Sequence, residues 1–149
     1  MRIVADTSGI VAAVVAAEPE HAACRSVLSE AAEVFVSPCV VTEVCFLLQF
    51  GGHAAAVHHF LANLTDGFYE IVPLETRDFA TIDALMEKYD GGLKRKRAKP
   101  GTLDLADAHN VVIAARRETN LLLTLDQDYR AVKPLAGLPH FALLPDDLG

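Results

Sequence analysis

The sequence predicts an α/β protein with three layers, in which helices cover both faces of a central, mainly parallel sheet of about five strands. Two observations support this prediction. Short apolar runs alternate along the 149 residues with stretches of helical spacing, the pattern of crossovers between parallel strands. Two of the apolar runs end at an aspartate, Asp6 and Asp126. Because ligands bind at the carboxyl ends of strands in such sheets, these aspartates mark a site. We expect one domain of residues 1–149.

Each element follows from its residue pattern. The apolar runs that suit strands are 3–5, 34–36, 69–74, 121–125 and 141–144. The stretches that suit helices are 8–18, 21–32, 38–50, 53–64, 76–89 and 104–118, with a short helical turn at 127–131. Ser8 is expected to cap the first helix. Ser37 and Pro38 suit the N-cap and first position of the third, which Gly51 ends.

The helix at 38–50 contains a single acid, Glu43. Its apolar stripe is expected to face the core and comprises Val40, Val44, Leu47 and Leu48, and core packing is also expected of Phe50. A glutamate beside such a stripe is costly unless it has a partner. The alternative is a side chain at the helix edge whose carboxylate reaches solvent.

The composition limits the classes of protein. No apolar run reaches the length of a membrane span, and Asp6 interrupts any signal-peptide core, so we expect a cytoplasmic protein. The three cysteines form no C-x-x-C pair, which argues against zinc and a disulfide framework. A net charge of −7 argues against a general nucleic-acid binder.

Positive charge is nevertheless concentrated in one polar loop, at 91–101. Five of the thirteen basic residues lie within 94–99: Lys94, Arg95, Lys96, Arg97 and Lys99. Such a run suits contacts to an RNA backbone, because phosphate contacts dominate affinity. A solvated loop explains it equally well. Tyr129 is a candidate for stacking on bases.

The remaining acids have ordinary explanations one at a time. Asp104 can cap the helix that begins there, and Asp107 suits the helix dipole in the first turn. Asp126 can cap the turn that follows it, and Asp128 can be solvated. Together, however, acids end two strands and begin two elements that follow crossovers. In a parallel sheet those places converge on one edge.

Four motifs in order resemble the PIN domain, and within it the VapC-type toxins of toxin–antitoxin pairs. They are Asp6-Thr7-Ser8, the lone helical Glu43, Leu105-Ala106-Asp107-Ala108 and Thr124-Leu125-Asp126-x-Asp128-Tyr129. The resemblance implies catalytic roles for Asp6, Glu43, Asp107 and Asp126. It implies metal ligation by Asp6, Asp107, Asp126 and Asp128, with polar support from Thr7, Ser8, Asp104 and Thr124. Asparagine is common in the family at position 104, so the aspartate there leaves the roles of Asp104 and Asp107 open.

The resemblance also implies an activity and partners. PIN domains are Mg²⁺- or Mn²⁺-dependent endoribonucleases, and carboxylates can hold the hard cations that activate water for phosphodiester hydrolysis. We therefore expect a cytoplasmic ribonuclease toxin that forms a homodimer and pairs with a small VapB-like antitoxin.

Three alternatives compete with this expectation. The first two are a PIN-like interaction module without catalysis and a housekeeping PIN nuclease. A full set of acids argues against the module. The third is a phosphate-accepting receiver domain, which needs adjacent acids after the first strand and a lysine at a late strand end. Asp6 stands alone and Thr124-Leu125-Asp126 replaces that lysine, which argues against this reading.

Overall fold

The computed structural model describes residues 1–90 and 102–149. The strands are β1 (Arg2–Ala5), β2 (Glu33–Val36), β3 (Glu70–Ile71), β4 (Leu121–Leu123) and β5 (Ala142–Leu144). The helices are α1 (Thr7–Val14), α2 (His21–Glu30), α3 (Pro38–Phe50), α4 (Ala54–Thr65), α5 (Asp78–Lys88), α6 (Leu105–Arg116) and the 3₁₀ helix η1 (Gln127–Ala131).

The five strands form one parallel sheet in the order β3-β2-β1-β4-β5, which confirms the expected fold class. β1 lies at the centre, and its Val4 is in register with Phe35 of β2 and Leu122 of β4. β3 is shorter than the expected 69–74, and its ladder with β2 ends where the Val72 N–H donates to the carbonyl of Val36, the last residue of β2.

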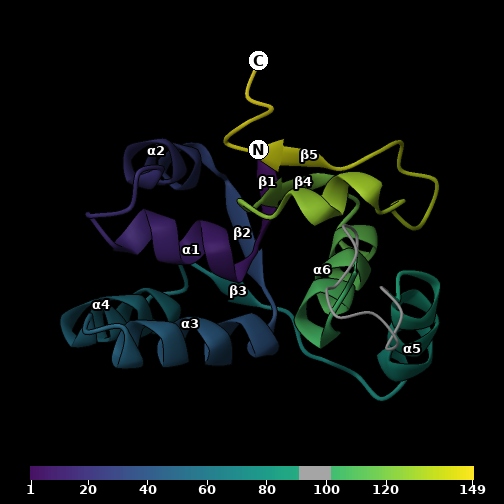
Figure 1. The fold of residues 1–149 in the computed structure, drawn as a ribbon, viewed down its shortest axis with the longest axis horizontal. Coiled ribbons are helices and arrows are strands. Elements are labelled where there is room, and N and C mark those ends of the chain that lie inside the picture. Colours follow the sequence, from purple (N-terminus) through teal and green to yellow (C-terminus); the bar gives the residue numbers. More distant parts are fainter. Residues whose placement is uncertain (91–101) are drawn as a thin grey trace.

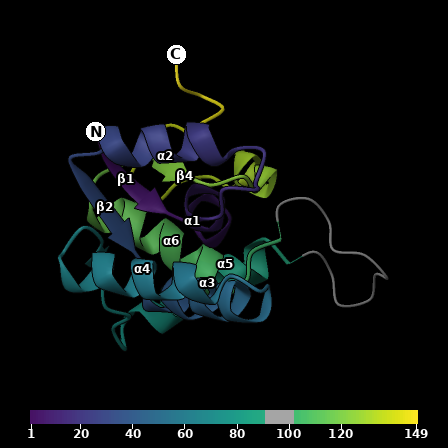
Figure 2. The same cartoon turned by 90° about the vertical axis from the view of Figure 1, so that its left-hand side faces the viewer.

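Helices cover both faces of the sheet. α1, α2, α3 and α4 lie on one face, and α5 and α6 lie on the other (Figure 1). Figure 2 looks onto the face that α1 to α4 cover. Successive side chains of a strand point to opposite faces. Ile3 and Ala5 accordingly pack with α1 to α4, whereas Val4 packs with the helices of the other face.

The first helix begins differently from the expectation. Asp6, not Ser8, occupies the N-cap of α1, and the helix begins at Thr7. α1 also lies very close to β4, because a Cβ on Gly9 would be 2.5 Å from the Leu123 carbonyl oxygen. Only glycine permits this approach, which brings the start of α1 beside the end of β4.

The structure of α3 confirms its predicted beginning and end and corrects two positions of its expected core face. Ser37 is its N-cap and accepts a hydrogen bond from the Cys39 N–H. Leu47 and Phe50, however, are 48% and 72% exposed, so the expectation that they face the core was wrong. The buried stripe is narrow and follows the i, i+4, i+8 row of Val40, Val44 and Leu48.

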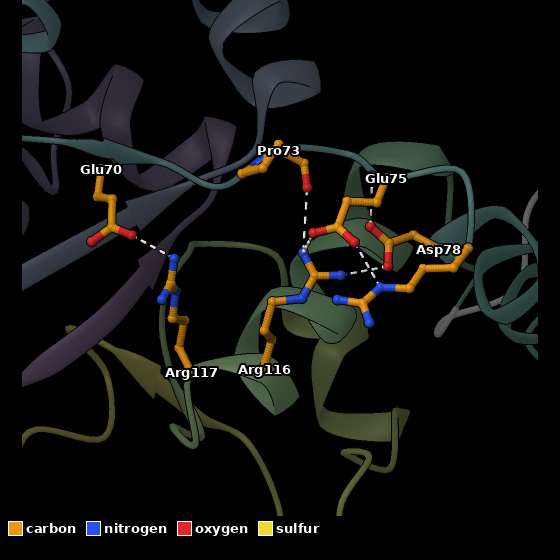
Figure 3. Close-up of polar contacts among 7 residues, drawn as sticks. Glu70, Pro73, Glu75, Asp78, Arg116 and Arg117 are labelled. Atoms are coloured by element: carbon orange, nitrogen blue, oxygen red, sulfur yellow. Dashed lines mark hydrogen bonds and ion pairs between the residues drawn. The ribbon is translucent and has the colours of Figure 1, made fainter.

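Ion pairs hold the C-terminal end of α6 (Figure 3). The Arg116 guanidinium pairs with Asp78, which begins α5, and with Glu75, and it donates to the Pro73 carbonyl. Arg117 pairs with Glu70 of β3. These contacts attach the C-terminal end of α6 to neighbouring elements.

In the described part of the chain, no helix is both long enough and apolar enough to cross a membrane. All three cysteines are free thiols, with Cys24 buried and Cys39 and Cys45 partly buried. The basic run at 94–99 lies outside the described residues.

Candidate active site

Asp6 follows β1 directly and is the most enclosed acid of the predicted set. Its side chain is only 6% exposed, and its N–H donates to the Leu123 carbonyl at 2.9 Å. Two hydroxyls reach its Oδ2: that of Thr124 at 2.8 Å and that of Ser8 at 3.1 Å. Ser8 and Thr124, which were expected as polar supports, therefore both hold this carboxylate.

The same hydroxyls position the segment after β4. Thr124 Oγ1 accepts a hydrogen bond from the Asp126 N–H at 3.0 Å, and Ser8 Oγ accepts one from the Leu125 N–H at 2.9 Å. Asp126 is the N-cap of η1, and its Oδ1 accepts from the Asp128 N–H at 2.9 Å. Asp126 is thus a cap, as sequence reasoning allowed, and it also lies close enough to Asp6 for their charges to interact.

Glu43 reaches the site from α3. Its carboxylate is half-buried, and Oε2 accepts a hydrogen bond from the Thr7 hydroxyl at 2.6 Å. Thr7 follows Asp6 in the chain, so the bond links the glutamate to the end of β1. Glu43 therefore has the partner that its place beside an apolar stripe requires.

Asp104 and Asp107 divide their roles at the start of α6. Asp104 is exposed and is the N-cap, and its Oδ1 accepts from the Asp107 N–H at 2.9 Å. Asp107 returns the bond, since its Oδ2 accepts from the Asp104 N–H at 3.1 Å. This reciprocal pair is a capping box. Asp107 is half-buried, and its other oxygen, Oδ1, is directed to the interior network.

Asn110, which sequence reasoning missed, and Tyr129, for which it expected base stacking, connect these acids. Asn110 Nδ2 donates to Asp6 Oδ1 and to Tyr129 Oη, both at 3.1 Å. The Tyr129 hydroxyl donates in turn to Asp107 Oδ1 at 3.1 Å. One signal could have identified Asn110: it lies three residues after Asp107, on the same face of the helix.

Tyr129 does not serve as a base-stacking residue. Its ring is 1% exposed and packs edge-to-face against Phe141. Burial raises the pKa of its phenol well above the usual value, and the charges of Asp6 and Asp107 add to the effect. The phenol therefore keeps its proton and remains a hydrogen-bond donor.

Burial and mutual repulsion raise the pKa values of two acids in the site. Burial raises the pKa of Asp6, which the hydroxyls of Thr124 and Ser8 partly oppose and the charge of Asp126 increases. Burial also raises the pKa of Asp107 to about 8, with the charges of Asp104 and Asp6 as further causes. Burial of acids that also repel one another is thus the main electrostatic property of the site.

The donor set fits a hard divalent cation. Carboxylate oxygens are the ligands that Mg²⁺ and Mn²⁺ prefer, and a cation would relieve the repulsion that raises the pKa of Asp107. Within residues 1–90 and 102–149, no three His, Cys, Asp or Glu side chains are grouped closely enough to hold an ion by themselves. Magnesium keeps several waters and needs only one or two carboxylates, so such a group is not required.

Two parts of the predicted site stay outside this network. The described contacts of Asp128 to the other acids run through its backbone N–H. The basic residues at 94–99 lie outside the described residues, so their role in RNA binding stays a prediction.

Comparisons with known proteins identify the family to which the sequence and the fold are similar. The family model described as "PIN domain" matches residues 3–134, a span that includes every acid discussed above. The chain is 30% identical over 145 residues to "Ribonuclease VapC26" from Mycobacterium tuberculosis, and the alignment covers 96% of this chain and all of that protein. The fold is similar, with a TM-score of 0.68 and 18% identity, to the crystal structure of M. tuberculosis VapC20, described as a "Sarcin-Ricin loop cleaving toxin". That match covers 87% of this chain and 93% of the other.

Proposed function

This chain belongs to the PIN-domain family, within its VapC-type branch, and from that membership we propose that it is a divalent-metal-dependent endoribonuclease and the toxin of a toxin–antitoxin pair. One observation carries the proposal. Asp6 and Asp107 are far apart in the sequence, and hydrogen bonds through the side chains of Asn110 and Tyr129 join them. Asp126 lies close enough to Asp6 for their charges to interact.

The acids would have different roles in phosphodiester hydrolysis. Asp6 and Asp126 would hold the cation, with Asp107 completing the site. When bound, Mg²⁺ or Mn²⁺ supplies positive charge to the scissile phosphate and the leaving oxygen and acidifies water. Glu43, which the Thr7 hydroxyl orients, would position the attacking water and accept its proton.

The partners belong to the same proposal. RNA is the substrate, with the basic run at 94–99 as its backbone contact, and a small antitoxin is the protein partner in the cytoplasm. We also propose a homodimer. In support, Phe46, Leu47 and Phe50 leave an exposed apolar surface on α3, with the two phenylalanine rings 4.7 Å apart.

The replacement Asp6→Asn tests the proposed site. The change removes a charge and a metal ligand yet keeps the shape and one acceptor oxygen, so RNA cleavage in Mg²⁺ or Mn²⁺ should be lost. Loss of one charge from a group of like charges should leave the metal-free melting temperature equal or higher. Cleavage of a labelled RNA and thermal unfolding in chelator measure the two effects.

Asp83→Asn is the matched control, because Asp83 lies exposed on α5 and the chemical change is the same. It should leave both measurements at the wild-type values. Full cleavage by Asp6→Asn would contradict the assigned site. Cleavage by neither the wild type nor the control would instead favour an interaction module without catalysis.

A further inference from the structure

The side chains of Asn110 and Tyr129 form the only described bridge between Asp6 and Asp107 within residues 1–90 and 102–149. Asn110 has two amide hydrogens, and both are used: one bonds Asp6 Oδ1 and the other bonds Tyr129 Oη. The Tyr129 oxygen accepts that bond and donates its own hydrogen to Asp107 Oδ1. When both acids are ionised, the bonds run in one direction, from the amide outward to the two carboxylates.

The bridge is rigid because both of its members are buried. Asn110 is completely buried and Tyr129 is 1% exposed. The amide cannot turn over, since its oxygen would then face the Asp6 carboxylate as a second acceptor. In buried surroundings such bonds are strong, and their geometry is correspondingly restrictive.

The side chain of Asn110 also lowers the stability of the folded chain. Its Oδ1 is buried and accepts no hydrogen bond from any described residue. An unpartnered buried acceptor destabilises the folded chain, and an apolar side chain in this helix segment would avoid it. The two positions at Val111 and Ile113 are apolar and buried, and His109 is buried and polar but bonds the Ser37 hydroxyl through Nδ1. A polar residue kept at such a position indicates a role other than stability.

We propose that Asn110 and Tyr129 are positioning residues that fix the rotamers of Asp6 and Asp107 relative to each other, so that the two carboxylates are prepared for one divalent cation. The inference rests on the proposed function, since it assumes that these acids bind the metal. It assigns no contact of either residue with substrate. Loss of a group that orients a metal ligand in this way typically lowers metal affinity or activity about 10- to 100-fold.

The test is Tyr129→Phe, which removes one oxygen and keeps the buried ring. Mn²⁺ alone serves as the probe, with free Mn²⁺ quantified by electron paramagnetic resonance in the absence of RNA. Affinity should fall about tenfold, the scale expected for loss of a ligand-orienting bond. In cleavage assays kcat should fall while KM for RNA stays near the wild-type value, and the circular dichroism spectrum should not change.

Tyr69→Phe is the matched control. Tyr69 is also buried, and it packs against Phe60 and Phe68 away from the acids. The Tyr69→Phe variant should bind Mn²⁺ as the wild type does. Asn110→Ala should weaken Mn²⁺ binding as well, and its combination with Tyr129→Phe should weaken it by less than the product of the two single effects, because either change interrupts the same chain of bonds.

The outcomes separate this inference from the proposed function. If Tyr129→Phe binds Mn²⁺ like the wild type while Asp6→Asn does not, the positioning role is wrong and the metal site stands. If Asp6→Asn also binds Mn²⁺ like the wild type, the site itself is wrong. Independent effects of the two changes in the combined variant would likewise overturn the bridge.

Discussion

At the scale of single residues, Asp107 connects stability to pH. Its pKa is about 8 in the folded chain and near 3.8 when exposed, so the folded state holds one more proton between these values. The stabilisation that this proton brings is complete below the lower pKa and is lost as the pH rises through the higher one. The raised pKa of Asp6 acts in the same direction.

We therefore predict that the metal-free protein loses melting temperature steadily from about pH 4 to about pH 8. In Asp107→Asn the decline should be shallower, because that position no longer releases a proton. Saturating Mg²⁺ should also reduce the decline in the wild type, since a cation replaces the proton. Thermal unfolding across this range, at constant ionic strength and with or without Mg²⁺, measures all three. Parallel curves for the wild type and Asp107→Asn would contradict the assignment of this titration.

Single residues also show what the sequence could and could not predict. Asp6 and Asp126 were identifiable because apolar strands end at them, and the structure places both at one edge of the sheet. Asn110 was not, and the role of Tyr129 was misjudged, because both depend on side-chain contacts across 19 positions of sequence. A buried tyrosine at the end of an acidic motif looks the same in the sequence as an exposed one that could stack on bases.

At the scale of elements, α3 shows the limit of helical periodicity. The pattern identified the helix, its cap and its buried row of Val40, Val44 and Leu48. It misplaced Leu47 and Phe50 because the width of the covered stripe depends on the elements packed against it. The exposed apolar end that results supports the proposed homodimer, which the resemblance to the family first suggested.

We predict that the double replacement of Phe46 and Phe50 by Ser converts the homodimer to a monomer. Both side chains are more than half exposed on α3, so their loss should leave the core intact while it removes most of the apolar contact area. Light scattering coupled to size-exclusion chromatography gives the mass in solution. Phe79→Ser on α5, where the side chain is 50% exposed, is the control and should remain a dimer. A monomeric wild type would rule out the proposed dimer.

At the scale of the whole molecule, topology brings the acids together. β1 is central, β2 and β4 flank it, and all three run in the same direction, so the segments that follow them share one edge. This is why Asp6 and Asp126 could be assigned to one edge from the order of strands and helices, whereas the role of Glu43 was implied by the resemblance to the PIN domain. The sequence did not determine how far apart they lie, because the close approach of α1 to β4 at Gly9 depends on three-dimensional packing.

The acidic edge of the sheet also suggests how a protein partner would inhibit the enzyme. A site dominated by carboxylates invites a cation from the partner, and arginine suits it best, since its planar group binds two carboxylate oxygens and keeps its charge. Such a contact would compete with metal and RNA for Asp6 and its neighbours. We therefore predict that induced expression of this chain alone arrests growth of a bacterial host and that co-expression of a small protein encoded beside it relieves the arrest.

The growth experiment compares the wild type with Asp6→Asn, each with and without the neighbouring gene. The wild type alone should arrest growth, and Asp6→Asn should not, because the arrest depends on cleavage and the variant lacks a metal ligand. An immunoblot must show equal amounts of both proteins. If Asp6→Asn is as toxic as the wild type, the toxicity does not come from the acids described here. If an abundant and active wild type does not slow growth, the toxin assignment is wrong and a housekeeping nuclease is favoured. The same metal-dependent cleavage would then act on RNA that is not essential for growth.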